Sequence, residues 1–124
     1  MMSLDMARLR ARVMAEIRKF FDQRSYLEVD TPLLAPALIP EPHIEVFATA
    51  YRDPHDGAGA ESMAGPAARY LIPSPELWMK ELLSAGYGNI YQLGHCFRNA
   101  ESFGPQHSPE FTMLEWYTVN ADYM

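Results

Sequence analysis

The sequence predicts an α+β fold in which a long N-terminal helix packs on an antiparallel sheet. Apolar residues recur with a helical period from about residue 4 to residue 24. Two later segments, 90–98 and 110–119, are rich in β-branched and aromatic residues and show no helical period. The turn residues between them, among them Gly104 and Pro105, predict a hairpin with a long tip.

The composition indicates one small globular domain. The 124 residues are 48% hydrophobic and 21% charged, which suits a single core and excludes a disordered chain. We expect no membrane segment, because no apolar run approaches the roughly 20 residues that span a bilayer. The N-terminus has no apolar signal-peptide core, and the single cysteine, Cys96, suits the cytoplasm. We expect Cys96 to be a small buried strand residue.

The formal charge of −6 is unevenly distributed along the chain. Residues 1–24 hold six basic and three acidic residues, a balance of +3, and residues 25–124 hold four basic and thirteen acidic residues, a balance of −9. An acidic body argues against broad nucleic-acid binding. The basic N-terminal helix could contact RNA or an acidic partner, but such a helix more often presents a solvated face.

The N-terminal helix is expected over residues 4–24, with Asp5 as its N-cap. No proline or glycine interrupts the segment. Its apolar residues are spaced three or four apart and fall on one face, which comprises Met6, Leu9, Val13, Ile17, Phe20 and Phe21.

Extended segments alternate with loops through the middle of the chain. Residues 24–34 alternate in polarity and predict an extended segment, and the proline-rich residues 35–43 predict a loop. Residues 44–49 alternate again and predict a strand. A connection rich in glycine, alanine and proline over residues 52–68 precedes a short strand at 69–72.

A second helix is expected after this strand and runs to about Ala85. Pro75 suits its first turn and Ser74 is expected to cap it, while Gly86 and Gly88 stop it. The apolar side of this helix comprises Leu77, Met79, Leu82 and Leu83.

The predicted hairpin has two distinct faces, because alternate strand residues point to opposite sides. One pairing of the strands gathers a guanidinium that suits phosphate, an aromatic face that suits a base, and a carboxylate beside a phenol that suits an ammonium group. The composition alone favours the simpler interpretation, an amphipathic hairpin with ordinary core aromatics. The residues gathered on this face are Gln92, Arg98, Phe111, Glu115 and Tyr117.

Residues 97–117 carry the most specific pattern: FRNAE, a variable turn, and then HSPEFTMLEWY. This pattern resembles motif 2 of class II aminoacyl-tRNA synthetases of the lysine type, in particular the elongation factor P lysyltransferase branch and lysyl-tRNA synthetase. A long helix followed by YLEVDTP resembles motif 1, at about residues 6–34, which forms much of the dimer interface in that family. Ser25 stands where the family usually has glycine, and we expect a turn with negative φ there.

The resemblance implies an ATP site and an amino-acid site on the predicted hairpin and second helix. Arg98 matches the catalytic arginine, which contacts the α-phosphate of ATP and the substrate carboxylate. Phe111 matches the residue that stacks on adenine. The remaining positions that match ATP contacts are Asn99, Ala100, Glu101, His107, Ser108 and Glu110, and those that match contacts to a lysine-like substrate are Ser74, Pro75, Glu76, Glu115 and Tyr117.

Three positions depart from the family pattern on the ATP side. Ala100 replaces a common acid, Gln106 a common arginine, and Ser108 a common asparagine. Motif 3, with its arginine and Mg²⁺-binding acids, is not matched, so residues 1–124 read as a single domain that is the N-terminal part of a class II catalytic core. The histidines lack metal-ligand spacing, so no metal site is predicted within these residues.

The resemblance implies a cytoplasmic, homodimeric ligase that uses ATP and Mg²⁺. It would activate lysine or β-lysine as an aminoacyl-adenylate and transfer it to elongation factor P or to tRNA, and both the amino acid and the acceptor stay open. The 124 residues alone are expected to be inactive. The alternative is a non-catalytic, dimer-forming binding module, which the departures at Ala100, Gln106 and Ser108 favour.

Overall fold

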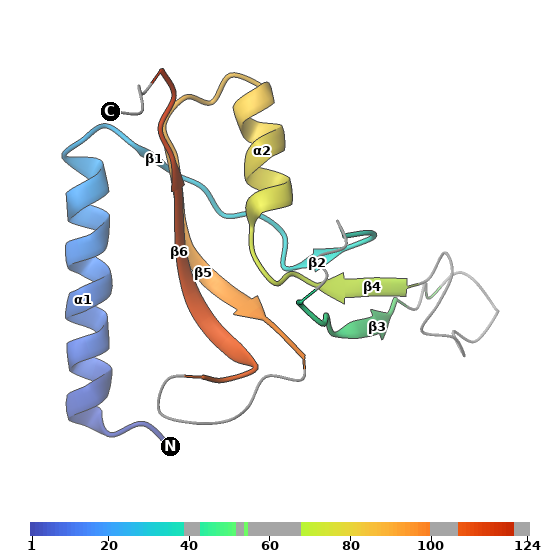
Figure 1. Cartoon of the computed structure of the whole chain (residues 1–124). Helices are drawn as coiled ribbons and strands as arrows, with labels where there is room; N and C mark the ends of the chain where they lie inside the picture. Colours follow the sequence, from blue (N-terminus) through green and yellow to red (C-terminus); the bar gives the residue numbers. More distant parts are fainter. Residues whose placement is uncertain (39–42, 52–53, 55–67, 100–106, 121–124) are drawn as a thin grey trace.

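The computed structural model describes residues 1–38, 43–51, 54, 68–99 and 107–120. Its elements confirm the α+β class: a long helix, a shorter helix and two small sheets (Figure 1). In chain order they are α1 (Leu4–Asp22), β1 (Leu27–Glu28), β2 (Leu34–Ala35), β3 (Ala48–Ala50), β4 (Ala68–Leu71), α2 (Glu76–Ser84), β5 (Ile90–Phe97) and β6 (Glu110–Tyr117).

Helix α1 begins at Leu4, two residues earlier than an N-cap at Asp5 would allow. Ser3 is the N-cap, and its hydroxyl accepts a hydrogen bond from the backbone N–H of Met6 at 3.2 Å. The prediction of Asp5 as N-cap is therefore wrong, because Asp5 already lies in the first helical turn. Its carboxylate there faces the positive end of the helix dipole.

The end of α1 corrects the prediction for Ser25, which adopts a positive φ of 60°. The backbone N–H of Tyr26 donates to the carbonyl of Phe21, and that of Ser25 donates to the carbonyl of Asp22, each at 3.0 Å. This pair of bonds requires a left-handed residue after the helix end. The serine therefore keeps the backbone that a glycine would adopt more easily.

The first sheet has the order β1-β5-β6 and contains the predicted hairpin. Strands β5 and β6 are antiparallel, from Ile90 opposite Tyr117 to Phe97 opposite Glu110. Strand β1 joins the other edge of β5 in parallel, so the sheet is mixed rather than wholly antiparallel. A parallel neighbour needs a long crossover, and the chain between β1 and β5 provides one that includes α2.

The second sheet has the order β2-β4-β3 and is antiparallel throughout. The short strand expected at 69–72 is confirmed as β4. The strand expected at 44–49 begins only at Ala48, because Glu45 instead forms an isolated bridge with Asn99 of the hairpin. Most of the predicted connection at 52–68 lies outside the described residues.

Helix α2 begins after the expected Ser-Pro pair. The prediction of Ser74 as the cap is wrong, because Pro75 is the N-cap residue and no side chain caps the helix. The Oγ atom of Ser74 only accepts a long hydrogen bond, at 3.4 Å, from the backbone N–H of Glu76. Gly86 and Gly88 follow the helix with φ of 85° and 78°, which confirms them as the residues that end it.

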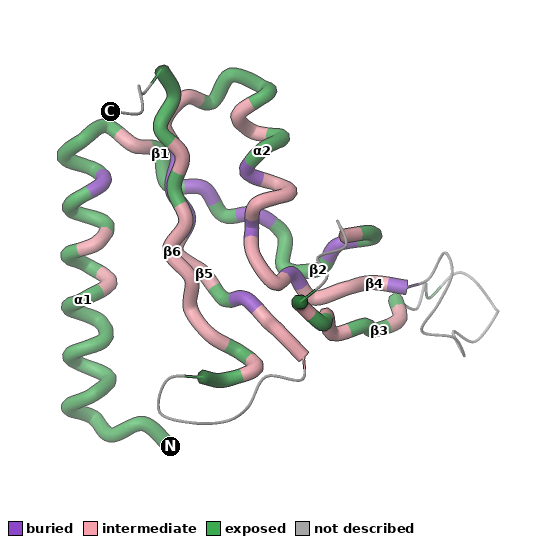
Figure 2. The backbone as a smooth tube through the Cα atoms, in the orientation of Figure 1, coloured by how far each residue is buried: buried purple, intermediate pink, exposed green. Residues whose placement is uncertain are grey.

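Two clusters of buried side chains lie on the side of the hairpin that faces α2 (Figures 1 and 2). Val29, Met79 and Ile90 form one cluster, and Ala35, Ile72 and Cys96 form the other. Cys96 is buried as predicted, and this burial raises the pKa of its thiol to about 11. The partly buried side chains around the second cluster are Leu38, Trp78, Phe111 and Met113.

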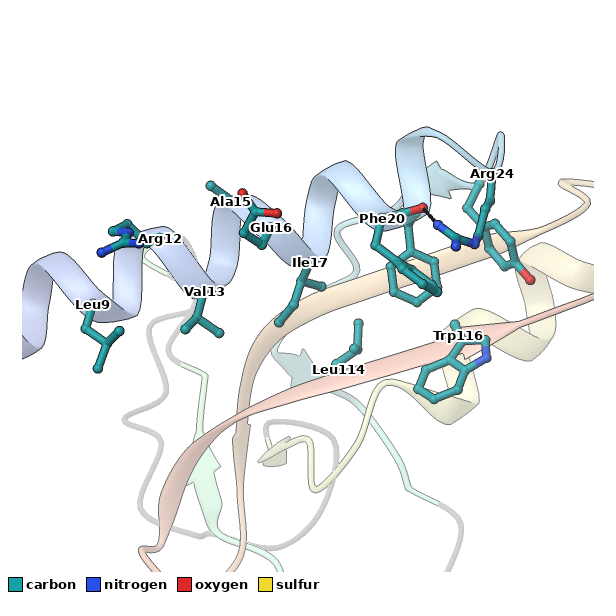
Figure 3. Close-up of a pocket in the computed structure, with 12 residues that line it drawn as sticks. Leu9, Arg12, Val13, Ala15, Glu16, Ile17, Phe20, Arg24, Leu114 and Trp116 are labelled. Carbon is teal, nitrogen blue, oxygen red and sulfur yellow. Dashed lines mark hydrogen bonds between the residues drawn. The ribbon is translucent and has the colours of Figure 1, made fainter.

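Helix α1 covers the opposite face of the hairpin and touches it mainly through its C-terminal end. Phe21, the buried residue of α1, stacks on Tyr91 with ring centroids 4.5 Å apart and also contacts Trp116. Farther along the helix, Leu9 and Val13 remain about half exposed, at 50% and 49%. A groove of about 900 Å³ therefore opens between α1 and β6 (Figure 3).

Candidate active site

The face of the hairpin that looks toward α2 carries the predicted charged and aromatic groups. Gln92 lies directly opposite Glu115, and Cys96 lies opposite Phe111. Opposite residues of an antiparallel pair share a face, so the predicted gathering of these side chains is confirmed. Arg98 continues the pairing, since its backbone N–H donates to the carbonyl of Pro109 at 2.9 Å.

Arg98 and Phe111 mark one end of this face. The guanidinium carbon lies 5.2 Å from the centre of the Phe111 ring, within cation–π range. The Nε atom of Arg98 is buried and has no hydrogen-bond partner. A buried guanidinium nitrogen without an acceptor suits an anionic ligand.

Glu76, Glu115 and Tyr117 mark the other end. Burial is the main cause that raises the pKa of the Glu115 carboxyl, and the charge of Glu76 adds to it. Burial and the two carboxylates raise the pKa of Tyr117 to about 12. The Oε2 atom of Glu115 is buried and accepts no hydrogen bond, so this end has an unmet capacity for a cation.

Lys80 is a site residue that the sequence analysis missed. Its ammonium lies 2.5 Å from Oε1 of Glu76, one helical turn earlier on α2. The hydrogen bond and charge of Glu76 raise the pKa of Lys80, and the charge of Glu115 adds to them. The spacing of four residues between Glu76 and Lys80 could have revealed this pair.

Thr31 is a second missed residue, and it fixes Gln92. The Oε1 atom of Gln92 accepts hydrogen bonds from the backbone N–H of Thr31 at 3.2 Å and from its hydroxyl at 2.7 Å. Both side chains are buried, at 8% and 3% exposure. No local sequence signal reveals this contact, because 61 residues separate its members.

The other predicted ATP contacts are more dispersed than the residues at the two ends of this face. The backbone N–H of Asn99 donates to the carbonyl of Glu45 at 2.8 Å. His107 and Ser108 are exposed before β6, and Glu110 is exposed on the face opposite Phe111. The predicted residues Ala100 and Glu101, and the departure at Gln106, lie outside the described residues. Of the predicted amino-acid contacts, Ser74 and Pro75 lead into α2 directly before Glu76.

Within the described parts of the chain, no three His, Cys, Asp or Glu side chains gather as a metal site would require. No helix among these residues is both long and apolar enough to cross a membrane.

Residues 2–124 match the family described as tRNA synthetases class II (D, K and N). The chain is 47% identical over 113 residues to the elongation factor P–(R)-β-lysine ligase of Yersinia enterocolitica, covering 91% of this chain and 32% of that protein. It is 43% identical over 121 residues to the ligase of the same name from Vibrio cholerae, covering 98% and 35%. The chain thus spans about a third of the length of these relatives. With a family match over nearly all of its length, the chain belongs to the class II tRNA synthetases of the D, K and N type.

Proposed function

We propose that the protein carrying this sequence activates lysine or β-lysine with ATP and transfers it to elongation factor P or to tRNA. The observation that carries this proposal is the polarity of one hairpin face, with the unpaired carboxylate oxygen of Glu115 at one end and the unpaired Nε of Arg98 at the other. A substrate with an ammonium group at one end and a reacting anion at the other suits such a face. The relatives named as β-lysine ligases favour elongation factor P as the acceptor.

At the acidic end, Glu76 and Glu115 would hold the ammonium groups of the substrate, and Tyr117 would orient them. Lys80 forms an ion pair with Glu76, and this pair is largely exposed, with side-chain exposures of 57% and 38%. Exposed ion pairs contribute little stability. A substrate ammonium that enters the more buried space near Glu115 can therefore replace Lys80 as the partner of Glu76.

At the basic end, Arg98 would stabilise the charge that develops when a carboxylate oxygen of the amino acid attacks the α-phosphorus of ATP. The new bond joins that oxygen to phosphorus, and pyrophosphate leaves with the electrons of the broken bond. Phe111 would stack on the adenine, with Asn99, Ala100, Glu101, His107, Ser108 and Glu110 as the further ATP contacts. Catalysis then rests on positioning and electrostatic stabilisation, with no covalent nucleophile of the protein.

ATP is expected to act with Mg²⁺, as the family resemblance implies. The described residues do not fit a Mg²⁺ site, since no cluster of acidic or other ligating side chains forms among them. We expect the ligands to come from outside these 124 residues, and no step of the proposed reaction is assigned to the ion.

Lysine-dependent exchange of pyrophosphate into ATP tests the proposal in the longest natural chain that contains these residues. Exchange with lysine or β-lysine, and none with aspartate or asparagine, is the expected result. Supplying elongation factor P and tRNA separately with labelled amino acid then identifies the acceptor. The 124 residues alone are expected to show no exchange above background, and robust exchange from them would contradict the assignment of further ATP-binding groups to other parts of the protein.

A second candidate function is that of a dimer-forming binding module without catalytic turnover. For both candidates, we propose a cytoplasmic location. The groove between α1 and β6 favours it, because Leu9, Val13 and Phe20 there are about half exposed and would be covered in a dimer. Both candidates predict a homodimer through residues 6–34. Light scattering measures the dimer, and the exchange assay separates the two candidates.

A further inference from the structure

Gly94 lies in the middle of the candidate active-site face and presents no side chain there. It lies in β5 opposite Met113, between the level of Glu115 and the level of Phe111. A methyl group added at Gly94 would meet only the side chain of Gln92, with Nε2 at 3.6 Å and Cγ at 4.0 Å. Glycine inside a strand weakens it, and often marks a place that a ligand approaches closely.

The Gln92 side chain lies beside Gly94 on this face, and its amide has a fixed orientation. The backbone N–H of Thr31 can only donate, so the atom that accepts from it at 3.2 Å must be the amide oxygen of Gln92. The amide nitrogen therefore points away from Thr31, and it lies next to the space above Gly94. A donor group of the protein therefore lies beside that space.

We propose that Gly94 and Gln92 form a subsite for the carboxyl-bearing end of the amino-acid substrate, an inference that rests on the proposed function. Strand residues rise about 3.3 Å each, so Gly94 lies roughly 7 Å along the face from the level of Glu115. From ordinary bond lengths, an extended lysine spans about 6 Å from its side-chain ammonium to its α-carbon. An ammonium held by Glu115 therefore places the carboxyl end above Gly94, on the way to Arg98.

Gln92 in this subsite donates from Nε2 to a carboxyl oxygen, and Gly94 provides the room. Thr31 acts as a positioning residue, because it touches Gln92 and holds the amide in its donating orientation. The alternative is purely structural: Gly94 is an ordinary strand glycine, and the contact between Thr31 and Gln92 only ties β1 and β2 to β5.

The substitution Gly94→Ala separates these alternatives. The protein itself has room for the added methyl, because the nearest atom would be at an ordinary contact distance of 3.6 Å. The methyl would instead meet the substrate. In the longest natural chain that contains these residues, we expect Gly94→Ala to raise the KM for lysine or β-lysine about tenfold, because the methyl would overpack a tight contact. The KM for ATP and the melting temperature should stay unchanged.

Gly88→Ala is the matched control. Gly88 has a φ of 78° in the turn before β5, so alanine is strained there although no atom lies within 4 Å of the added methyl. This variant should lower the melting temperature and leave both KM values unchanged.

Thr31→Val and Thr31→Ser test the positioning role. Valine keeps the shape and loses the hydroxyl donor, so it should raise the KM for the amino acid several-fold, and serine should restore it. In the wild-type protein, the ¹⁵N side-chain amide resonances of Gln92 should shift when lysine is added.

The outcomes separate the two levels of the proposal. Lysine-dependent exchange with a Gly94→Ala variant that keeps the wild-type KM for lysine overturns the subsite alone. The subsite proposal is also overturned if Gly94→Ala lowers the melting temperature and changes the KM for lysine and the KM for ATP equally. Absence of lysine-dependent exchange in the unmutated protein overturns the proposed function and the subsite with it.

Discussion

Replacing Glu115 by glutamine changes the charge of the candidate site and keeps its shape. Burial and the charge of Glu76 raise the pKa of the Glu115 carboxyl. A carboxyl whose pKa is higher in the folded state than in the unfolded state destabilises the fold when it is ionised. The destabilisation is full above the folded pKa and disappears as the pH falls below the ordinary carboxyl pKa. Glu115→Gln should therefore melt at the same or a higher temperature than the wild type at pH 7, and this gain should vanish in acid.

The same substitution should weaken the binding of lysine. The unpaired Oε2 of Glu115 is buried, so a substrate ammonium placed there forms a charge-assisted hydrogen bond away from water. The loss of such a bond costs about 2 kcal/mol, which corresponds to a rise of roughly 30-fold in the KM for lysine. The KM for ATP should change less than about twofold, because the proposed adenine and phosphate contacts lie at the other end of the face.

Pyrophosphate exchange and thermal melting measure the two effects on the same preparations. Loss of lysine affinity together with unchanged or higher stability is the expected combination, and an ordinary strand glutamate would give neither effect. An unchanged KM for lysine would refute the lysine-type assignment and leave only the membership of the class II family.

Three further predictions follow from other parts of the structure. Phe111→Ala should raise the KM for ATP about tenfold or more, because the stacking on the base is lost. It should also lower the melting temperature, because Phe111 packs on the cluster around Cys96. Lys80→Met should leave the melting temperature nearly unchanged and lower the KM for lysine, since Lys80 competes for Glu76; a raised KM would show instead that Lys80 assists binding. Val13→Asp places a charge in the apolar groove, so light scattering should show a shift from dimer to monomer, and an unchanged mass would place the interface elsewhere.

The hairpin could be predicted from the sequence because its information is local. Residues 110–117 are rich in aromatic residues and follow a run of turn residues, so they predict a strand, and the strand period of two then determines which side chains share a face. The structure has the pairing that places Gln92 opposite Glu115. The second helix and its glycine stop were predictable for the same reason, since capping and stop signals lie within a few residues of the helix ends.

The features that the sequence did not reveal depend on geometry or on distant contacts. Ser25 has a positive φ because two hydrogen bonds close the end of α1. The sequence does not indicate that a serine will adopt this conformation, because glycine is the residue usually found there. The bond from Thr31 to Gln92 joins segments that only the folded sheet brings together. Strand β1 runs parallel to β5, and a long crossover joins the two strands. The pattern of polar and apolar residues in two short segments does not indicate whether they pair in parallel.

The two proposed interactions, lysine binding and dimerisation, involve opposite faces of β6 and therefore alternate residues of this strand. Glu115 and Tyr117 look toward α2 and the candidate active site, while Leu114 and Trp116 line the groove beneath α1 (Figure 3). Phe21 stacks on Tyr91 from the groove side, and its neighbour in β5, Gln92, faces the site. A partner that fills the groove would therefore restrain the same two strands that position Gln92 and Glu115. Because the strands are shared, a substitution that opens the proposed dimer should also weaken lysine binding, although the groove residues of β6 lie on the face away from the candidate site.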